Sequence, residues 1–305
     1  MKLKLLIVVS WCITACSSQP NPSEETTKAT EHHPDFSSYW YAGVAELNHY
    51  QLSQARYGEE RKGDAVLIFV TEDFLPKKQV KNESADNSKS TTVLKTNFIK
   101  KFTTGIYDYS LMSSIFTPIN SNEYPSTLKV STSSQEWCGH TYLQLNKRKQ
   151  NFEFTGHSYF MNEADEKGQI ANVLLEDELF NRIRLDYQTI PTGEVDLLPS
   201  TQWLRLSHTA IKPQKAVISL TETEFALTLN IKYHKIEREV NIKFEKEFPN
   251  KILGWEESFP SGYGENRKIM TTIAVLDTTI LSPYWSKNKN EDEKLRELLN
   301  PTDRN

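Results

Sequence analysis

The sequence predicts a mainly β protein with a single antiparallel β-rich domain, built as an open or half-barrel-like sheet or as a sandwich. Apolar and polar residues alternate along several segments, which is typical of strands with one wet face in an antiparallel sheet. Aromatic residues, which suit sheet surfaces, make up 11% of the chain. Helical spacing is confined to one central and one short C-terminal segment. The alternating sets are Leu227, Leu229 and Ile231; Val240, Ile242 and Phe244; and Ile269, Thr271, Ile273 and Val275.

Residues 1–15 have the composition of a cleavable export signal, with two early lysines and a short apolar stretch before small residues. The ending Ile13-Thr14-Ala15-Cys16 resembles the lipobox of bacterial lipoproteins, in which the cysteine is lipidated and becomes the first mature residue. The apolar stretch is too short for a membrane-spanning helix, which needs about 20 residues. We therefore expect a lipid on Cys16 to hold the mature chain on a membrane, outside the cytoplasm.

Residues 16–35 are predicted to form a flexible tether, because they are rich in Ser, Pro, Thr and Glu and contain no Phe, Tyr or Trp. The pair His32-His33 is interpreted as part of this solvated segment. Residues 36–300 are expected to form the folded domain, which opens with a cluster of aromatic residues.

Within the domain, Ala65–Val70 is short and β-branched, as a fully buried strand should be. The polar segment Lys77–Thr92 is predicted to be a long exposed hairpin loop. Helical spacing over Glu163–Leu185 predicts the central helix, and a capping box of Asn290 and Glu293 predicts a terminal helix through Leu298. A division into two domains near Asp186–Ser200, where Pro and Gly cluster, is the alternative.

Composition excludes some functions. The net charge of −4 and the pI near 6.0 give no electrostatic reason to expect nucleic acid as a partner. With Cys12 removed in the signal and Cys16 lipidated, Cys138 is the only thiol left, so no intrachain disulfide is expected. The common phosphate-loop, nucleophile-elbow, dinucleotide and zinc-protease motifs are absent from the sequence. Adjacent carboxylates such as Glu256-Glu257 are interpreted as solvated strand ends.

The segment Gln135–His140 is the most suggestive for chemistry. On a strand, Glu136, Cys138 and His140 would share one side, and a thiol beside an imidazole is how nucleophilic cysteines are activated. His157 on the next strand would complete a set of three zinc ligands with Cys138 and His140. We favour the simpler interpretation that Cys138 is a small buried hydrophobe and that Gly139 marks a bulge or a close approach of backbone. No resident metal or cofactor is expected.

Several segments resemble an uncharacterised lipoprotein family of Bacteroidetes-type Gram-negative bacteria, some of whose members carry the label "septum formation inhibitor Maf". The resemblance spans nearly all of the mature chain but does not include the Ser-x-x-Arg-Arg-type motif of the Maf pyrophosphatases, so it implies no catalytic residues. The segments are Trp40–Gly43, Gln54–Glu59, Val70–Pro76, Glu136–His140 and Tyr284–Asn288.

These observations predict a non-enzymatic envelope lipoprotein that binds an apolar small molecule or an envelope protein. Ser17 after the modified cysteine favours the outer membrane, with the domain facing the periplasm. One alternative is a hydrolase that uses Cys138 with His140 or His157, or a metal held by them. The other is a structural part of an envelope assembly.

Overall fold

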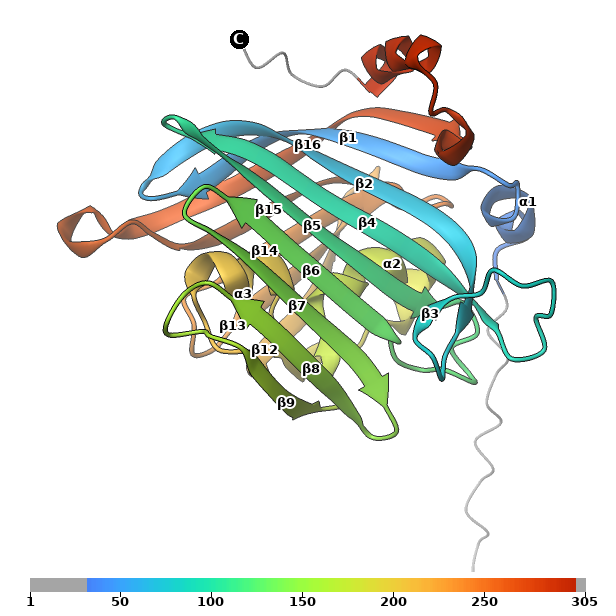
Figure 1. Cartoon of the computed structure of the whole chain (residues 1–305), viewed down its shortest axis with the longest axis horizontal. Coiled ribbons are helices and arrows are strands. Elements are labelled where there is room, and N and C mark those ends of the chain that lie inside the picture. The colour runs from blue at the N-terminus through green and yellow to red at the C-terminus, as the bar shows by residue number, and fades with distance from the viewer. Residues whose placement is uncertain (1–31, 300–305) are drawn as a thin grey trace, which may run out of the picture. The chain divides into compact units, whose positions relative to one another are not determined.

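The structure, a computed structural model, describes residues 32–299. They form one 16-stranded, open and mostly antiparallel sheet, as the sequence predicts, which curves around two short helices (Figure 1). The strand order is β10-β11-β12-β13-β14-β15-β16-β1-β2-β4-β5-β6-β7-β8-β9, with β3 beside β2. The two edges, β9 and β10, follow each other directly in the chain, so the sheet almost closes on itself between Ala171 and Leu174.

The strands are β1 (Ala45–Arg56), β2 (Glu59–Leu75), β3 (Val80–Lys81), β4 (Thr91–Thr104), β5 (Tyr107–Pro118), β6 (Lys129–Glu136), β7 (Gly139–Arg148), β8 (Asn151–Ser158), β9 (Glu166–Ala171), β10 (Leu174–Leu175), β11 (Gly193–Leu198), β12 (Gln214–Glu222), β13 (Ala226–Tyr233), β14 (Glu239–Glu245), β15 (Ile252–Ser261) and β16 (Lys268–Ser282). The α-helices are α1 (Phe36–Trp40), α2 (Leu179–Asp186) and α3 (Thr201–Ser207). Short 3-10 helices are η1 (Glu176–Glu178), η2 (Tyr187–Thr189), η3 (Gly264–Asn266), η4 (Tyr284–Ser286) and η5 (Asn290–Leu299).

Helices α2 and α3 pack against the concave face of the sheet, where the main hydrophobic cluster lies (Figure 1). Polar side chains attach both helices to strands. Asn181 of α2 donates to the carbonyl of Leu94 and to Thr117 Oγ1, each at 2.9 Å. Gln202 of α3 donates to the carbonyl of Phe98 at 3.0 Å. All three hydrophobic clusters found in the described part of the chain draw on residues 36–299, so this part carries its own core.

The core also buries charge. Arg184 forms a two-bond ion pair with Glu46, at 2.6 and 2.5 Å, and both side chains are at most 1% exposed. A second group joins Arg238 to Glu176 and Glu257, and Lys100 donates to Glu257 at 2.7 Å. The interpretation of Glu257 as a solvated strand end is therefore wrong, while its neighbour Glu256 is exposed.

Two of the alternating sets lie as predicted, and one faces the other way. Leu227, Leu229 and Ile231 of β13 and the set on β14 are buried. On β16 the buried residues are Thr272 and Ala274, whereas Ile269, Ile273 and Val275 are 57%, 39% and 57% exposed. A period of two shows that a strand has two unlike faces but not which face is buried; on β16 the buried face carries the smaller residues.

The predicted central helix over Glu163–Leu185 is wrong in most of its length. This segment contains β9, β10 and η1 before α2 begins at Leu179. In the fold, residues 166–171 of this segment instead form the edge strand β9, which pairs with β8. The sheet also runs through the proposed division near Asp186–Ser200, because β11 pairs with β12. Asn290–Leu299 is helical as expected, but as a 3-10 helix. The predicted loop Lys77–Thr92 is exposed over residues 83–89, but it also contains β3 and the start of β4 and buries Gln79 and Asn82.

The predicted signal, the predicted lipidation site Cys16 and most of the predicted tether lie outside the described residues. Within residues 32–299, no helix combines the length and the hydropathy needed to cross a membrane.

Candidate functional site

A pocket of about 530 Å³ opens where α3 ends. The helix stops at Ser207, and His208 caps it in the left-handed conformation, with φ of 52°. The walls come from this helix end, from the turn between β1 and β2, from the Lys235–Glu237 connection and from the β15–β16 hairpin turn. Ligand sites in proteins commonly have volumes of about 300 to 1,000 Å³.

Two glycines allow the hairpin turns at this pocket to meet. Gly58 and Gly262 have φ of 79° and 95°, which favours glycine. A Cβ on Gly262 would lie 2.5 Å from the carbonyl oxygen of Asn266, so a larger residue does not fit there. Ser261 Oγ accepts a hydrogen bond from the Gly58 amide at 3.1 Å, which joins the two turns.

Arg56 is the buried cation of the pocket, with 8% of its surface exposed. Its guanidinium donates to the Leu206 carbonyl at 2.5 Å and to the hydroxyls of Tyr57 and Tyr109, each at 3.2 Å. It lies 4.3 Å from the centroid of the Tyr57 ring. All of these partners are neutral, and no ion pair within residues 32–299 includes Arg56. Burial normally brings a charge together with an opposite charge.

The remaining walls of the pocket combine aromatic rings, aliphatic side chains, two exposed cations and the carboxylate of Glu237. The rings of Tyr57 and Tyr263 lie 6.0 Å apart, and Trp203 packs under the guanidinium of Arg238 at 4.9 Å. Lys235 and Arg267 stand exposed at the rim, where Arg267 contacts Glu237 at 3.4 Å. Burial and the hydrogen bonds with neighbouring tyrosines raise the pKa of Tyr57, so its hydroxyl stays protonated at neutral pH.

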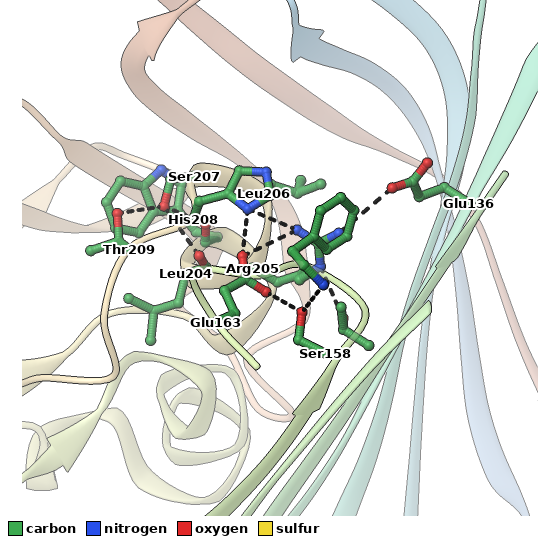
Figure 2. A network of polar contacts seen from close by, with 12 residues as sticks. Glu136, Ser158, Glu163, Leu204, Arg205, Leu206, Ser207, His208 and Thr209 are labelled. Carbon is green, nitrogen blue, oxygen red and sulfur yellow. Dashed lines mark hydrogen bonds and ion pairs between the residues drawn. The ribbon is translucent and has the colours of Figure 1, made fainter. Parts of the chain in front are cut away.

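Arg205, next to this pocket, is the centre of a network that holds α3 to β6, β7 and the loop after β8 (Figure 2). Its Nε donates to Thr141 Oγ1 at 2.9 Å, and its terminal nitrogens lie 3.6 Å from Glu136 and 3.7 Å from Glu163. The guanidinium also covers the Phe160 ring at 4.4 Å. This network fixes the helix end that forms one wall of the pocket.

Glu163 binds two further groups in Figure 2, since Ser158 Oγ donates to it at 2.7 Å and the Nδ1 side of His208 contacts its other oxygen. A carboxylate that orients an imidazole supplies two of the three members of a catalytic triad. The hydroxyls nearby already have partners, because Ser207 Oγ lies 2.8 Å from both the Trp203 carbonyl and Thr209 Oγ1, and Ser158 donates to Glu163. No hydroxyl or thiol of the described residues donates to His208, so the pair lacks a nucleophile.

The structure separates the residues that the sequence grouped. Glu136 ends β6 and Gly139 begins β7, so Trp137 and Cys138 form the turn of a hairpin rather than one strand. Cys138 is a free, exposed thiol, which contradicts the expected buried position. Its amide donates to Glu136 Oε2 at 2.8 Å, and that carboxylate raises the pKa of the thiol. A Cβ at Gly139 would lie 2.8 Å from the Phe160 ring, so this glycine leaves room for the ring and not for a backbone segment.

The two histidines do not join this thiol. His140 pairs with Gln135 in the ladder and His157 with Tyr142, so they do not face each other. His157 contacts Asp165 at 3.2 Å, with more than half of its side chain exposed. Within the described residues no three His, Cys, Asp or Glu side chains are close enough to hold a metal ion.

Of the predicted candidates, only Glu136 enters the network, through Arg205. Sequence reasoning missed Arg56, Arg205, Glu163 and His208, because each is an ordinary charged residue without a local motif. The signal that was present is Gln54–Glu59, which the family resemblance includes and which contains Arg56, Tyr57 and Gly58.

Comparisons with protein-family models, with curated proteins and with solved structures find no match for this chain. A proposal of function therefore rests on the sequence and on the geometry.

Proposed function

We propose that this chain is an exported, lipid-anchored binding protein of the bacterial envelope, held by Cys16 on the outer membrane and facing the periplasm. Its ligand is a small amphipathic molecule with an apolar body and an acidic group, bound in the pocket at the end of α3. The anchor and the address follow from the sequence of residues 1–16, and the family resemblance agrees with them. The ligand class follows from the pocket.

The observation that carries the ligand class is Arg56, a cation with 8% exposure and only neutral partners at the pocket wall. An acidic ligand supplies the missing negative charge, and hydrogen bonds between charged groups contribute roughly 1.5 to 3 kcal/mol. The rim cations Lys235 and Arg267 attract the same charge, and Tyr57, Trp203 and Tyr263 offer flat surfaces for an apolar body. The pocket thus favours an amphipathic acid over the purely apolar ligand that the sequence suggested.

The hydrolase alternative receives no support from this geometry. The thiol of Cys138 has a carboxylate beside it rather than an imidazole, and the carboxylate raises its pKa instead of lowering it. A nucleophilic cysteine requires the opposite arrangement.

Two fluorescent probes with the same aromatic body test the ligand class. 1-Anilinonaphthalene-8-sulfonate carries a negative charge, and N-phenyl-1-naphthylamine is its neutral analogue. Both probes are titrated into the chain from Ser17 onward, which keeps the whole described core. At low salt the sulfonate should bind about ten-fold more tightly than the neutral probe. Equal affinity of the two probes contradicts the acidic ligand, and binding of neither contradicts the pocket as a ligand site.

Variants locate the binding. Replacing Ser207 with Trp places a ring at the pocket wall and should weaken both probes, while Ser219→Trp on an exposed stretch of β12 is the matched control. Lys235→Gln with Arg267→Gln should weaken the sulfonate alone by about three- to ten-fold. Lys268→Gln, which removes a neighbouring charge outside the pocket lining, should change neither affinity.

A further inference from the structure

A second pocket, of about 640 Å³, lies at a different part of the fold and is strongly basic. It is lined by the turn after β2, the β5–β6 connection and the β7–β8 turn. Lys77, Lys147, Arg148 and Lys149 contribute four cations to its lining, and Glu123 contributes the one carboxylate. We call this surface the basic groove.

The cations of the basic groove are poorly neutralised by the protein itself. The ion pairs within residues 32–299 include only one of them, Arg148, which lies 3.8 Å from the half-exposed Glu153. Lys147 Nζ donates to a backbone carbonyl of its own turn, that of Lys149, at 2.5 Å. Lys129, next to the groove, likewise donates to the carbonyl of Gln79 at 3.1 Å. Burial lowers the pKa of Lys129, and the nearby Arg148 lowers it further.

The basic groove lies at the end of the sheet where the described chain begins. Thr71 of β2 donates to the carbonyl of Trp40, the last residue of α1, at 2.7 Å. Strand β2 then continues from Thr71 to Leu75 and enters the Pro76–Gln79 turn that lines the groove. In Figure 1, α1 and β3 accordingly lie at the same end of the strands. Cys16 precedes His32, the first described residue, by only sixteen positions.

We propose that the basic groove docks the folded part of the chain on the anionic headgroups of the membrane that holds its anchor. This rests on the lipid-anchored state in the proposed function and is separate from the ligand of the α3 pocket. Phosphate headgroups present many negative charges in one plane, and each nearby Lys or Arg adds to the attraction. Tyr124 of the groove packs against the cluster of Phe74, Val93 and Leu128, so the charged side chains carry the contact with the headgroups.

Sedimentation with vesicles tests the proposal on the chain from Ser17, which lacks the lipid. Binding should occur on vesicles of phosphatidylcholine with 30 mol % phosphatidylglycerol, and not on phosphatidylcholine alone. It should fall by about ten-fold or more when salt rises from roughly 0.05 to 0.5 M, because the charges are exposed. Failure to bind the anionic vesicles overturns the docking, and it leaves the probe experiment on the α3 pocket unaffected.

Substitutions decide whether the basic groove is the surface used. Lys77→Gln with Lys149→Gln removes two exposed groove charges and should weaken vesicle binding by roughly five-fold per lysine. The matched control, Lys212→Gln with Lys232→Gln, has the same net charge and should bind as the parent chain does. Equal loss in both variants overturns the assignment to the groove. Competition by millimolar glycerol-3-phosphate also overturns it, because it would show a site for a soluble phosphate ester.

Discussion

Arg184 of α2 and Glu46 of β1 form a two-bond ion pair in the interior, with nitrogen–oxygen distances of 2.6 and 2.5 Å. The Arg184 guanidinium also lies 5.2 Å from the Trp40 ring and 4.9 Å from the Phe69 ring. Asn48 donates to the same carboxylate at 2.7 Å. Although burial opposes ionisation, Arg184 holds the pKa of Glu46 below its ordinary value. The concave side of this sheet therefore holds matched charges as well as rings.

Breaking this pair should destabilise the fold strongly. Arg184→Met leaves the Glu46 carboxylate buried without its partner and should lower the free energy of unfolding by about 3 to 5 kcal/mol. Adding Glu46→Gln should restore much of the loss. The exposed pair of Lys215 and Asp196 is the control, and Lys215→Met should lower stability by less than about 1 kcal/mol. Urea unfolding measures the stability of the parent and of the three variants. Equal losses of stability from Arg184→Met and Lys215→Met would contradict the buried pair.

The same pair gives stability a pH dependence of known sign. Because the pKa of Glu46 is lowered in the folded state, its contribution is complete above the ordinary value of 4.5. That contribution is lost as the pH falls through the lower folded value. The double variant Arg184→Met with Glu46→Gln should lack this part of the acid loss when unfolding is followed from about pH 7 to about pH 3. An unchanged acid slope would show that Glu46 is already protonated in the folded protein.

Asp177 should give stability a pH dependence of the opposite sign. Burial raises its pKa from 3.8 to about 6, although the Thr201 amide at 2.9 Å favours the charged form. The folded protein therefore retains this proton longer, and the stability that the group contributes is lost as the pH rises through about 6. Asp177→Asn should become more stable relative to the parent between about pH 4 and pH 7, by about 3 kcal/mol at most. A constant difference across that range would contradict the raised pKa.

Cys138 should react as an exposed but unactivated thiol. A disulfide reagent should label it in the folded protein, since the side chain is accessible. Glu136→Gln removes the carboxylate that raises the pKa, so labelling at pH 7.5 should become several-fold faster. Protection of the thiol in the parent chain, or no change in rate, would contradict the geometry of this turn.

Glu163 should hold the loop after β8 against α3. Its carboxylate accepts from Ser158 and contacts both His208 and Arg205. Glu163→Ala should speed hydrogen exchange of the Phe160 and Ala164 amides while changing global stability by only about 1 kcal/mol. Unchanged exchange in this loop would show that the network in Figure 2 does not restrain it.

The sequence reveals the sheet because its signal is local. Alternation on β13 and β14 identifies both strands and their buried faces. On β16 the alternation is just as clear, yet Val275 faces solvent and Ala274 faces the core, since the choice of face depends on the partner strands. The segment 163–178 shows that local spacing is also ambiguous. Its apolar residues are spaced as in a helix, but in the fold β9 of this segment pairs with β8.

The candidate site was mostly hidden from the sequence because its residues come together only in the fold. Arg56, Arg205 and Lys235 lie far apart along the chain, and none belongs to a motif. The sequence suggested Cys138 as a candidate because it is the only cysteine after residue 16, but a hairpin turn exposes it to solvent, away from His157. The buried carboxylates Glu46 and Glu257 were equally hidden, since a sequence with 40 acidic residues does not distinguish paired acids from solvated ones.

The central claim is tested most directly by identifying the small molecules that the protein retains when it is purified from its own cell envelope. Native mass spectrometry should detect one acidic, amphipathic compound bound near one to one in the parent chain and depleted in the Ser207→Trp chain. The Ser219→Trp control should retain it. Retention of only neutral lipid, or equal retention by the parent and Ser207→Trp chains, would contradict an acidic ligand in the pocket beside Arg56.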